Sequence, residues 1–164
     1  MFPDDIQAAA DAVVQAAIRA GAMIATAESC TGGLVSGALT AVAGSSAALD
    51  RGFVTYSNEA KAEILGVPED LLARFGAVSE QVARAMATGA VERSRASASV
   101  SITGIAGPGG GSPEKPVGLV HFAAVGLGGE VVHVERRFGD IGREAVRLES
   151  VRVALSLLLD AVKA

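Results

Sequence analysis

The sequence has 164 residues, the size of one domain, so we expect residues 1–164 to form a single domain. Its formal net charge of −4 at pH 7 gives no basis for nucleic-acid binding. The single cysteine, Cys30, excludes an intrachain disulfide and suits a reducing compartment. No apolar run reaches membrane-spanning length, and the acidic start of the chain does not resemble a signal peptide. We therefore expect a cytoplasmic protein that binds neither membrane nor nucleic acid.

The first part of the chain is predicted to alternate helices and strands. Asp4 or Asp5 can cap a first helix that Gly21 ends. The apolar residues at helical spacing in it are Ile6, Ala9, Val13 and Ala17. Asn58 is predicted to cap a short helix that ends at Gly66. Between these helices we expect a strand at 23–27, a helix at 34–42 and a strand at 52–56.

The second part adds two more helices and then a hairpin. A helix follows Pro68 and ends before Gly76, and Ser79 is predicted to cap a longer one. Strands are expected at 97–103, 117–125 and 130–136, with a glycine-rich hairpin at 126–129. The final helix should bury Ala145, Leu148, Val151, Leu155 and Leu158. Helices between the early strands imply parallel crossovers. The fold class is therefore α/β, a three-layer α/β/α sandwich with a mixed, mostly parallel sheet.

Ser29 lies at the predicted turn from a strand to a helix. A helix start leaves backbone N–H groups without partners, and the glycines at 32 and 33 let the backbone approach a ligand. A hydroxyl beside such donors is what acyl transfer needs, because the hydroxyl attacks and the donors stabilise the oxyanion. A serine in this position more commonly caps a helix in a tight turn, so the residues alone leave both roles open.

Lys61 falls in the first turn of the helix that Asn58 is expected to begin. The positive end of the helix dipole disfavours a charged amine there, and partial burial would lower its pKa further. A neutral lysine can act as a general base, and Tyr56, at the end of the preceding strand, can hold or relay a proton. From spacing alone, a solvated lysine and a tyrosine packed at the sheet edge are the commoner alternatives.

Segment 104–111 contains five glycines and must be a loop. It lacks the lysine and hydroxyl residue of a P-loop and is not a dinucleotide fingerprint. It is either a flexible connection or a loop whose backbone approaches a ligand.

Cys30 is the rival nucleophile, but it would need a histidine base, and only His121 and His133 exist. A buried cysteine more commonly packs as a small apolar residue. Two separate histidines and one cysteine also lack metal-ligand spacing, so no metal is expected.

The C-terminal region is locally basic. Arg143 and Arg147 are i,i+4 like charges, and nearby glutamates at i,i+3 spacing offset their repulsion. A solvated helix face is the favoured interpretation, and a phosphate contact from Arg143 is the alternative.

Four motifs resemble those of the CinA C-terminal family. They are TAESCTGG at 26–33, RGFVTYSNEAK at 51–61, GAVSE at 76–80 and SITGIAGP at 101–108. The resemblance extends from about residue 6 to residue 159. It implies an α/β/α sandwich, nicotinamide-nucleotide amidase activity, no cofactor or metal, and a homodimer or higher homo-oligomer.

The resemblance also implies site residues. The family's nucleophile matches Ser29, and its assisting tyrosine and lysine match Tyr56 and Lys61. We expect nicotinamide mononucleotide to be held by the nucleophile turn, by the glycine-rich loop and by Arg143. The residues predicted to bind it are Glu28, Cys30, Thr31, Gly32, Gly33, Asn58, Thr103, Gly104, Gly107 and Arg143.

Three alternatives stay open at this point. The chain could be a non-catalytic pyridine-nucleotide-binding module, or an interaction protein associated with competence or DNA damage. It could also act on another nucleotide or nucleoside amide, because acyl chemistry does not specify the ring.

Overall fold

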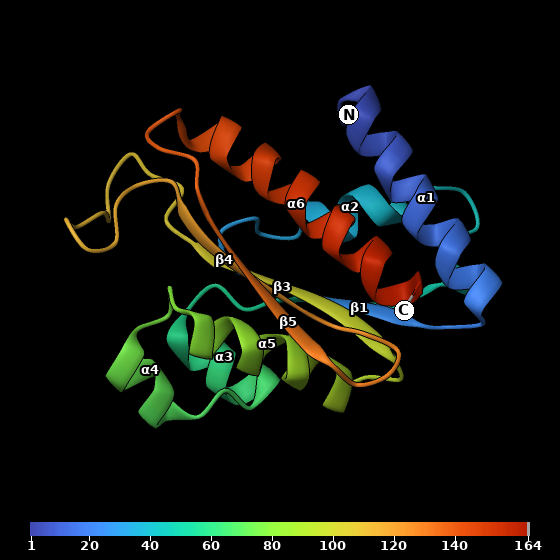
Figure 1. The fold of residues 1–164 in the computed structure, drawn as a ribbon, viewed down its shortest axis with the longest axis horizontal. Helices are drawn as coiled ribbons and strands as arrows, with labels where there is room; N and C mark the ends of the chain where they lie inside the picture. Colours follow the sequence, from blue (N-terminus) through green and yellow to red (C-terminus); the bar gives the residue numbers. More distant parts are fainter. Residues whose placement is uncertain (164) are drawn as a thin grey trace.

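The computed structural model describes residues 1–163, which fold into three layers with a central sheet (Figure 1). The strands are β1 (Ile24–Glu28), β2 (Leu49–Val54), β3 (Ala98–Gly104), β4 (Leu119–Val125) and β5 (Val131–Arg137). The helices are α1 (Asp4–Ala20), α2 (Leu34–Thr40), α3 (Asn58–Leu65), α4 (Glu69–Phe75), α5 (Glu80–Glu92) and α6 (Arg143–Lys163). A short 3-10 helix, Ser45–Ala47, precedes β2. None of the helices in the described chain is both long enough and apolar enough to cross a bilayer.

The sheet has the strand order β2-β1-β3-β4-β5. Strand β1 pairs in parallel with both β2 and β3, whereas β4 is antiparallel to both of its neighbours. Because β5 is antiparallel to β4, it runs in the same direction as β1, β2 and β3. The predicted mixed, mostly parallel sheet is confirmed.

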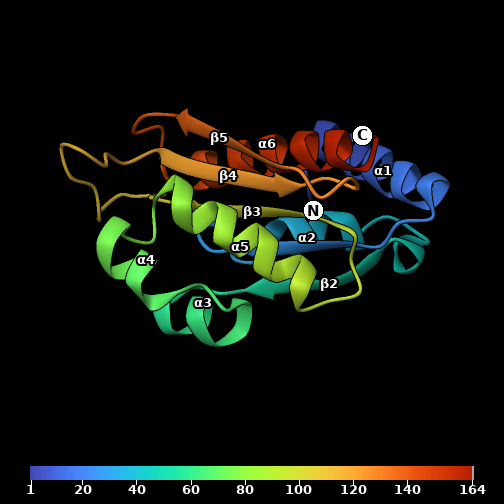
Figure 2. The same ribbon diagram turned by 60° about the horizontal axis from the view of Figure 1, so that its bottom comes forward.

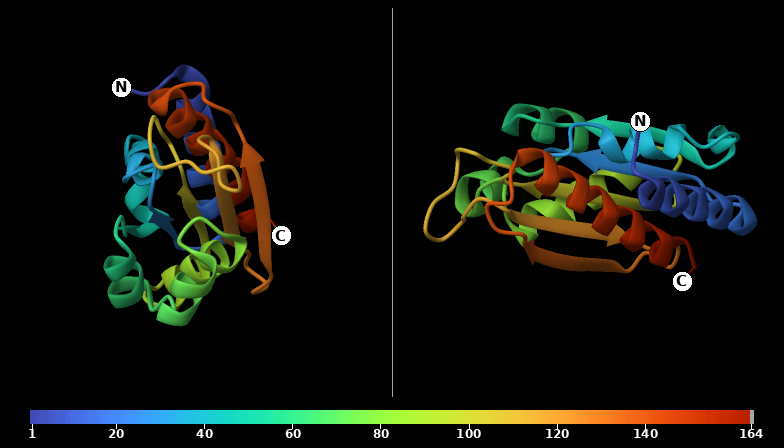
Figure 3. Two further views of the ribbon diagram at one scale, coloured as in Figure 1. Left: turned by 90° about the vertical axis from the view of Figure 1, so that its left-hand side faces the viewer. Right: turned by 90° about the horizontal axis from the view of Figure 1, so that it is seen from above.

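Helices cover both faces of this sheet. Helices α1, α2 and α6 pack on one face, and α3, α4 and α5 on the other (Figures 1 and 3). Helix α5 crosses the second face against β3 and β4, as Figure 2 shows. The larger apolar core lies under α1 and α6 and includes Ile6, Val13 and Leu155, all fully buried. Of the residues expected to face inward, Ala9, Ala145 and Leu148 are only partly buried.

Two predicted helix caps are wrong. Helix α1 already includes Asp4, so Pro3 takes the capping position, without a side-chain hydrogen bond. Helix α3 is capped by Ser57, whose hydroxyl accepts from the backbone N–H of Ala60 at 3.1 Å. Asn58 is therefore the first helical residue, because the side chain of the residue before it already satisfies the free N–H. The predicted cap of α5 is confirmed, since Ser79 accepts from the backbone N–H of Val82.

The three parallel strands β1, β2 and β3 end at the same edge of the sheet. In the pairing register, Glu28 at the end of β1 is opposite Val54 of β2 and Ile102 of β3. The residues that follow these strands are therefore brought together, although they are far apart in the sequence. Ligands bind outside the carboxyl ends of strands in such sheets.

Candidate active site

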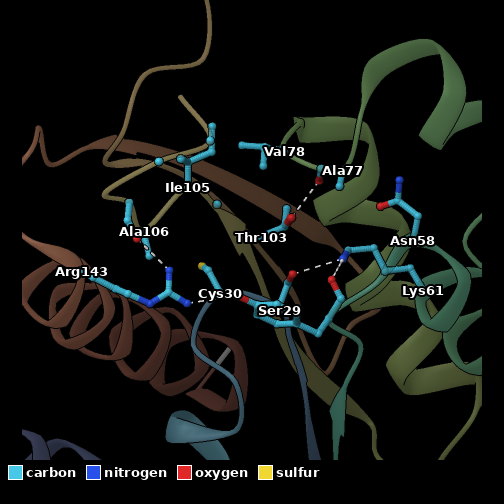
Figure 4. Close-up of a pocket in the computed structure, with 15 residues that line it drawn as sticks. Ser29, Cys30, Asn58, Lys61, Ala77, Val78, Thr103, Ile105, Ala106 and Arg143 are labelled. Carbon is cyan, nitrogen blue, oxygen red and sulfur yellow. Dashed lines mark hydrogen bonds between the residues drawn. The ribbon is translucent and has the colours of Figure 1, made fainter. Parts of the chain in front are cut away.

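A cavity of about 280 Å³ opens at this edge of the sheet. It is lined by residues from the nucleophile turn after β1, from the start of α3, from the segment before α5, from the glycine-rich loop after β3, and from the start of α6 (Figure 4). Among the residues predicted from the sequence, the cavity brings together Ser29, Cys30, Tyr56, Asn58, Lys61, Thr103, Gly104, Gly107 and Arg143. Ala77, Val78, Ile105 and Ala106, which are not among the predicted site residues, add an apolar wall.

Ser29 and Lys61 are in direct contact inside this cavity. The Nζ atom of Lys61 lies 3.1 Å from the Oγ atom of Ser29 (Figure 4). The same amine donates to the backbone carbonyl of Thr55 at 3.0 Å and to that of Tyr56 at 3.3 Å. Lysine side chains on a helix point back toward its N-terminus, which explains how Lys61 reaches the end of β2. This geometry places a basic nitrogen within proton-transfer distance of a hydroxyl.

The surroundings of Lys61 favour its neutral form. The residue is only 1% exposed, and burial lowers the pKa of its amine below the ordinary value. Within residues 1–163, Lys61 forms no ion pair with a carboxylate. The amine therefore lacks the partner that normally keeps a buried lysine charged.

Glu28 does not line the cavity but forms hydrogen bonds that connect the nucleophile turn to the start of α2. Its buried carboxylate accepts from the backbone N–H groups of Val35 and Ser36, each at 2.9 Å. The hydroxyls of Thr31 and Ser36 also donate to it, each at 2.8 Å. Glu28 thus satisfies the free N–H groups at the start of α2, as a capping side chain would. The sequence predicts that Glu28 contacts the substrate, but its carboxylate is buried and does not line the cavity.

The nucleophile turn leaves some backbone donors free. The N–H of Gly32 is used inside the turn, donating to the carbonyl of Ser29 at 3.0 Å. The N–H groups of Cys30 and Thr31 have no hydrogen-bond acceptor within residues 1–163. Gly33, with φ of 98°, takes the capping position of α2, where a side chain would be strained. Thr31, Gly32 and Gly33 shape the turn but do not line the cavity.

Tyr56 has a different position from the one expected. The residue is 61% exposed, and its hydroxyl accepts from Arg143 Nη2 at 3.1 Å. Its contact with Lys61 is made by the backbone carbonyl only. The structure therefore places the phenol at the mouth of the cavity and not between Lys61 and Ser29.

Arg143 joins two sides of the cavity mouth. Besides its contact with Tyr56, it donates through Nη1 to the carbonyl of Gly107 at 2.8 Å. On the opposite wall, the hydroxyl of Thr103 donates to the carbonyl of Ala77 at 2.8 Å, tying β3 to the segment before α5. Two of the five N–H donors of the Arg143 guanidinium are thus occupied, and the others are available to an anion.

Cys30 lies beside Ser29 but is poorly suited to act as a nucleophile. Burial raises the pKa of its thiol to about 12, so the reactive thiolate is disfavoured. His121 and His133 contact each other at 2.9 Å on β4 and β5 and do not line the cavity. Within the described chain, no group of three or more histidine, cysteine or acidic side chains is placed to hold a metal ion.

Arg147 was interpreted from the sequence as part of a solvated helix face, and the structure places it elsewhere. It donates through Nε to the carbonyl of Cys30 and through Nη2 to that of Thr31, both at 3.1 Å. No local sequence pattern predicts these contacts, because the partners lie 117 and 116 positions away in the sequence.

A sequence profile of the CinA C-terminal domain matches residues 6–162. The chain belongs to the CinA C-terminal domain family. Its relatives in this family include the nicotinamide-nucleotide amidohydrolase PncC of Escherichia coli K12, which is 51% identical over 159 residues, covering 96% of this chain and 95% of the relative. The PncC protein of Enterobacter agglomerans is 53% identical over 148 residues and 89% of each chain.

Solved structures of CinA proteins have the same fold. The competence/damage inducible protein CihA from Agrobacterium tumefaciens superposes with a TM-score of 0.96 at 56% identity, covering 100% of this chain and 99% of that one. A CinA superfamily protein from Escherichia coli superposes with a TM-score of 0.90 at 40% identity, covering 97% of this chain and 92% of the other. The α/β/α sandwich is therefore shared with these CinA proteins over more than nine tenths of each chain.

Proposed function

We propose that this chain hydrolyses the carboxamide of nicotinamide mononucleotide to nicotinate mononucleotide and ammonia. The observation that carries the proposal is the 3.1 Å contact between Lys61 Nζ and Ser29 Oγ in a buried part of the cavity. The names of the PncC relatives, which match this chain nearly end to end at 51–53% identity, supply the substrate. An amide is attacked by a hydroxyl only when a base removes the proton, and Lys61 supplies that base.

The acylation step begins with the neutral amine of Lys61. Such an amine has two N–H bonds and one lone pair, and the carbonyls of Thr55 and Tyr56 accept the two N–H bonds. The lone pair is then free to accept the proton of Ser29. As Oγ forms a bond to the carboxamide carbon, the proton moves to Nζ and the carbonyl π electrons move onto the oxygen.

The tetrahedral intermediate then loses ammonia. The free N–H of Cys30, which lines the cavity, is the oxyanion donor in this proposal. Protonated Lys61 returns its proton to the leaving nitrogen, because an amide nitrogen leaves poorly without one. The carbon–nitrogen bond breaks, ammonia departs, and an ester on Ser29 remains.

Water completes the cycle by the same route in reverse. Neutral Lys61 takes a proton from water as the water oxygen attacks the ester carbon. The bond from carbon to Ser29 Oγ breaks, and Lys61 returns the proton to that oxygen. Nicotinate mononucleotide leaves, and the hydroxyl and the amine are restored.

The remaining parts of the substrate fit the rest of the cavity. The apolar wall of Val78 and Ile105 suits the pyridine ring, which places the carboxamide beside Ser29. The backbone of the glycine-rich loop and the unoccupied donors of Arg143 suit the ribose phosphate. Asn58, at the rim, offers an amide to the ribose hydroxyls.

The test is ammonia release from nicotinamide mononucleotide, with nicotinamide and its riboside as controls. We expect release from the nucleotide, and a loss of about 10²-fold to 10⁴-fold on replacing Lys61 by Met. Ser29→Ala should release no ammonia, and Cys30→Ala should remain active. An inactive Cys30→Ala beside an active Ser29→Ala would contradict the serine assignment, and reaction of free nicotinamide alone would contradict recognition of the phosphate.

The rival functions predict other results in the same assay. A non-catalytic nucleotide-binding module would bind the nucleotide without releasing ammonia, and an interaction protein would do neither. The buried contact of Ser29 with Lys61 disfavours both, because neither role requires a buried lysine amine beside a hydroxyl. The proposal includes a cytoplasmic location and a homodimer or higher homo-oligomer, as the family resemblance implies.

A further inference from the structure

Helix α6 contacts the nucleophile turn through one side chain. The guanidinium of Arg147 donates through Nε to the carbonyl of Cys30 and through Nη2 to the carbonyl of Thr31, each at 3.1 Å. These carbonyls belong to two consecutive peptide units, Cys30–Thr31 and Thr31–Gly32. Within residues 1–163, Arg147 forms no ion pair, so these carbonyls are its hydrogen-bond partners.

We propose that Arg147 is a positioning residue that fixes the oxyanion-binding N–H of Cys30 in the nucleophile turn. The inference rests on the proposed acyl transfer at Ser29. Arg147 does not line the cavity and does not touch the substrate in this account. It acts through the orientation of the peptide groups that it holds.

The first of these peptide groups is held directly. A trans peptide unit is planar, with its C=O and N–H pointing in opposite directions. The carbonyl of Cys30 and the N–H of Thr31 belong to one such unit. When Arg147 holds this carbonyl on the α6 side, the N–H of Thr31 is turned away from α6, and it has no acceptor within the described chain.

The second is held through a relay of two peptide groups. Arg147 holds the carbonyl of Thr31, which belongs to the same unit as the N–H of Gly32. That N–H donates to the carbonyl of Ser29, at 3.0 Å. The carbonyl of Ser29 shares its unit with the N–H of Cys30, the donor nearest to the nucleophile. The same guanidinium therefore fixes the orientation of the N–H of Thr31 directly and that of the N–H of Cys30 through this relay.

Only arginine provides this contact. Its guanidinium is a rigid planar fork whose two parallel N–H bonds match two neighbouring acceptors, whereas a lysine amine is a single point donor. Helix α6 does not depend on the contact for its packing, because Val146, Val151 and Leu158 are fully buried in the core. Loss of Arg147 should therefore disturb the turn more than the fold.

The test compares Arg147→Ala with Arg152→Ala. Arg152 lies on the same helix, pairs with Asp5 at 2.6 Å, and is outside the cavity lining, so it controls for the loss of an arginine from α6. We expect Arg147→Ala to lower kcat about 10-fold to 100-fold with KM changed less than about two-fold, because the transition state alone needs aligned donors. Arg152→Ala should retain wild-type kcat and KM, and both variants should have similar Tm values.

Chemical rescue separates positioning from a general loss of structure. Guanidinium at low, non-denaturing concentration should raise kcat of Arg147→Ala and leave Arg152→Ala unchanged, because the added ion can occupy the vacated site. Arg147→Lys, which keeps the charge without the fork, should stay well below wild type. A kcat equal to that of Arg152→Ala, or a loss that guanidinium does not reverse, would overturn the inference.

A second readout is independent of the nucleotide. A fluorophosphonate reacts with a nucleophilic serine by forming a bond from Oγ to phosphorus and expelling fluoride, while the serine proton passes to Lys61. The phosphoryl oxygen needs the same N–H of Cys30, so Arg147→Ala should be labelled at Ser29 about 10-fold more slowly than Arg152→Ala. Equal labelling rates would overturn the inference even if the proposed substrate were wrong. Normal labelling of wild type without ammonia release would count against the proposed function alone.

Discussion

The amine of Lys61 lies 3.1 Å from the hydroxyl oxygen of Ser29, although 32 positions separate the two residues in the sequence. The contact forms because β1 and β2 are parallel neighbours, so the turn after β1 meets the helix after β2. It requires a lysine that is almost fully buried, and its burial has measurable consequences for both activity and stability.

The activity should depend on pH through Lys61. The base must be neutral, and burial lowers the pKa of this amine, so kcat/KM should be low in acid, rise through that lowered pKa, and level off above it. The measurement is kcat/KM across pH with nicotinamide mononucleotide, with recovery after return to high pH showing that the loss is protonation. A profile that is flat, or that falls as pH rises through neutrality, would contradict the role of Lys61.

The lowered pKa of Lys61 should also make the stability of the protein depend on pH. The folded state lowers the pKa of Lys61 below 10.5, so the unfolded state binds its proton more tightly. Burial of the amine therefore costs stability at neutral pH, and the cost disappears as pH rises toward 10.5. Because Lys61→Met has no such proton, the free energy of unfolding of wild type relative to this variant should increase over that range.

The matched control for this measurement is Lys163→Met, which removes an exposed lysine at the end of α6. Its stability relative to wild type should not change in the same way with pH. Denaturant melts at several pH values give the comparison. A difference between wild type and Lys61→Met that stays constant with pH would show that burial does not perturb the amine.

Glu28 should matter for the turn and not for substrate contact. In Glu28→Gln, an amide NH₂ replaces a carboxylate oxygen and faces backbone donors at Val35 or Ser36. An unsatisfied buried donor costs about 1–3 kcal/mol, so Tm should fall, whereas Glu63→Gln, on the exposed face of α3, should melt like wild type. Thermal unfolding followed by circular dichroism gives both values. Equal melting of the two variants would mean that the capping contacts carry no net stabilisation.

Tyr56 should contribute to substrate binding more than to proton transfer. Its hydroxyl contacts Arg143, whereas its contact with Lys61 uses a backbone carbonyl that Tyr56→Phe retains. We therefore expect KM to rise and kcat to change less than about ten-fold, well below the effect of losing a general base. Steady-state kinetics separate the two constants. A loss of kcat as large as that of Lys61→Met would instead place the phenol in the proton path.

The sequence predicted the elements of this site better than the directions of its side chains. The order of strands and helices, with parallel crossovers, correctly predicts that Ser29, Lys61 and Thr103 meet at one edge of the sheet. Two adjacent residues have different roles: Ser29 lines the cavity, whereas the Glu28 side chain binds the backbone N–H groups at the start of α2. Periodicity does not resolve that difference, because both side chains are buried.

Long-range contacts account for most of what the sequence left out. No sequence pattern links Arg147 to the nucleophile turn. The spacing of Arg143 and Arg147 on one helix instead suggested that both side chains are exposed to solvent. The phenol of Tyr56 points to Arg143, 87 positions away, for which no local rule exists. Such contacts depend on how α6 packs across the sheet, which is a property of the whole fold.

The most direct measurement of the central claim is mass spectrometry of the protein quenched during turnover of nicotinamide mononucleotide. Covalent catalysis by Ser29 predicts an added mass equal to the substrate minus ammonia, located by peptide mapping on Ser29 and absent from Ser29→Ala. Lys61→Met should accumulate it far more slowly. Steady ammonia release from Ser29→Ala, or an adduct on any other residue, would contradict the account.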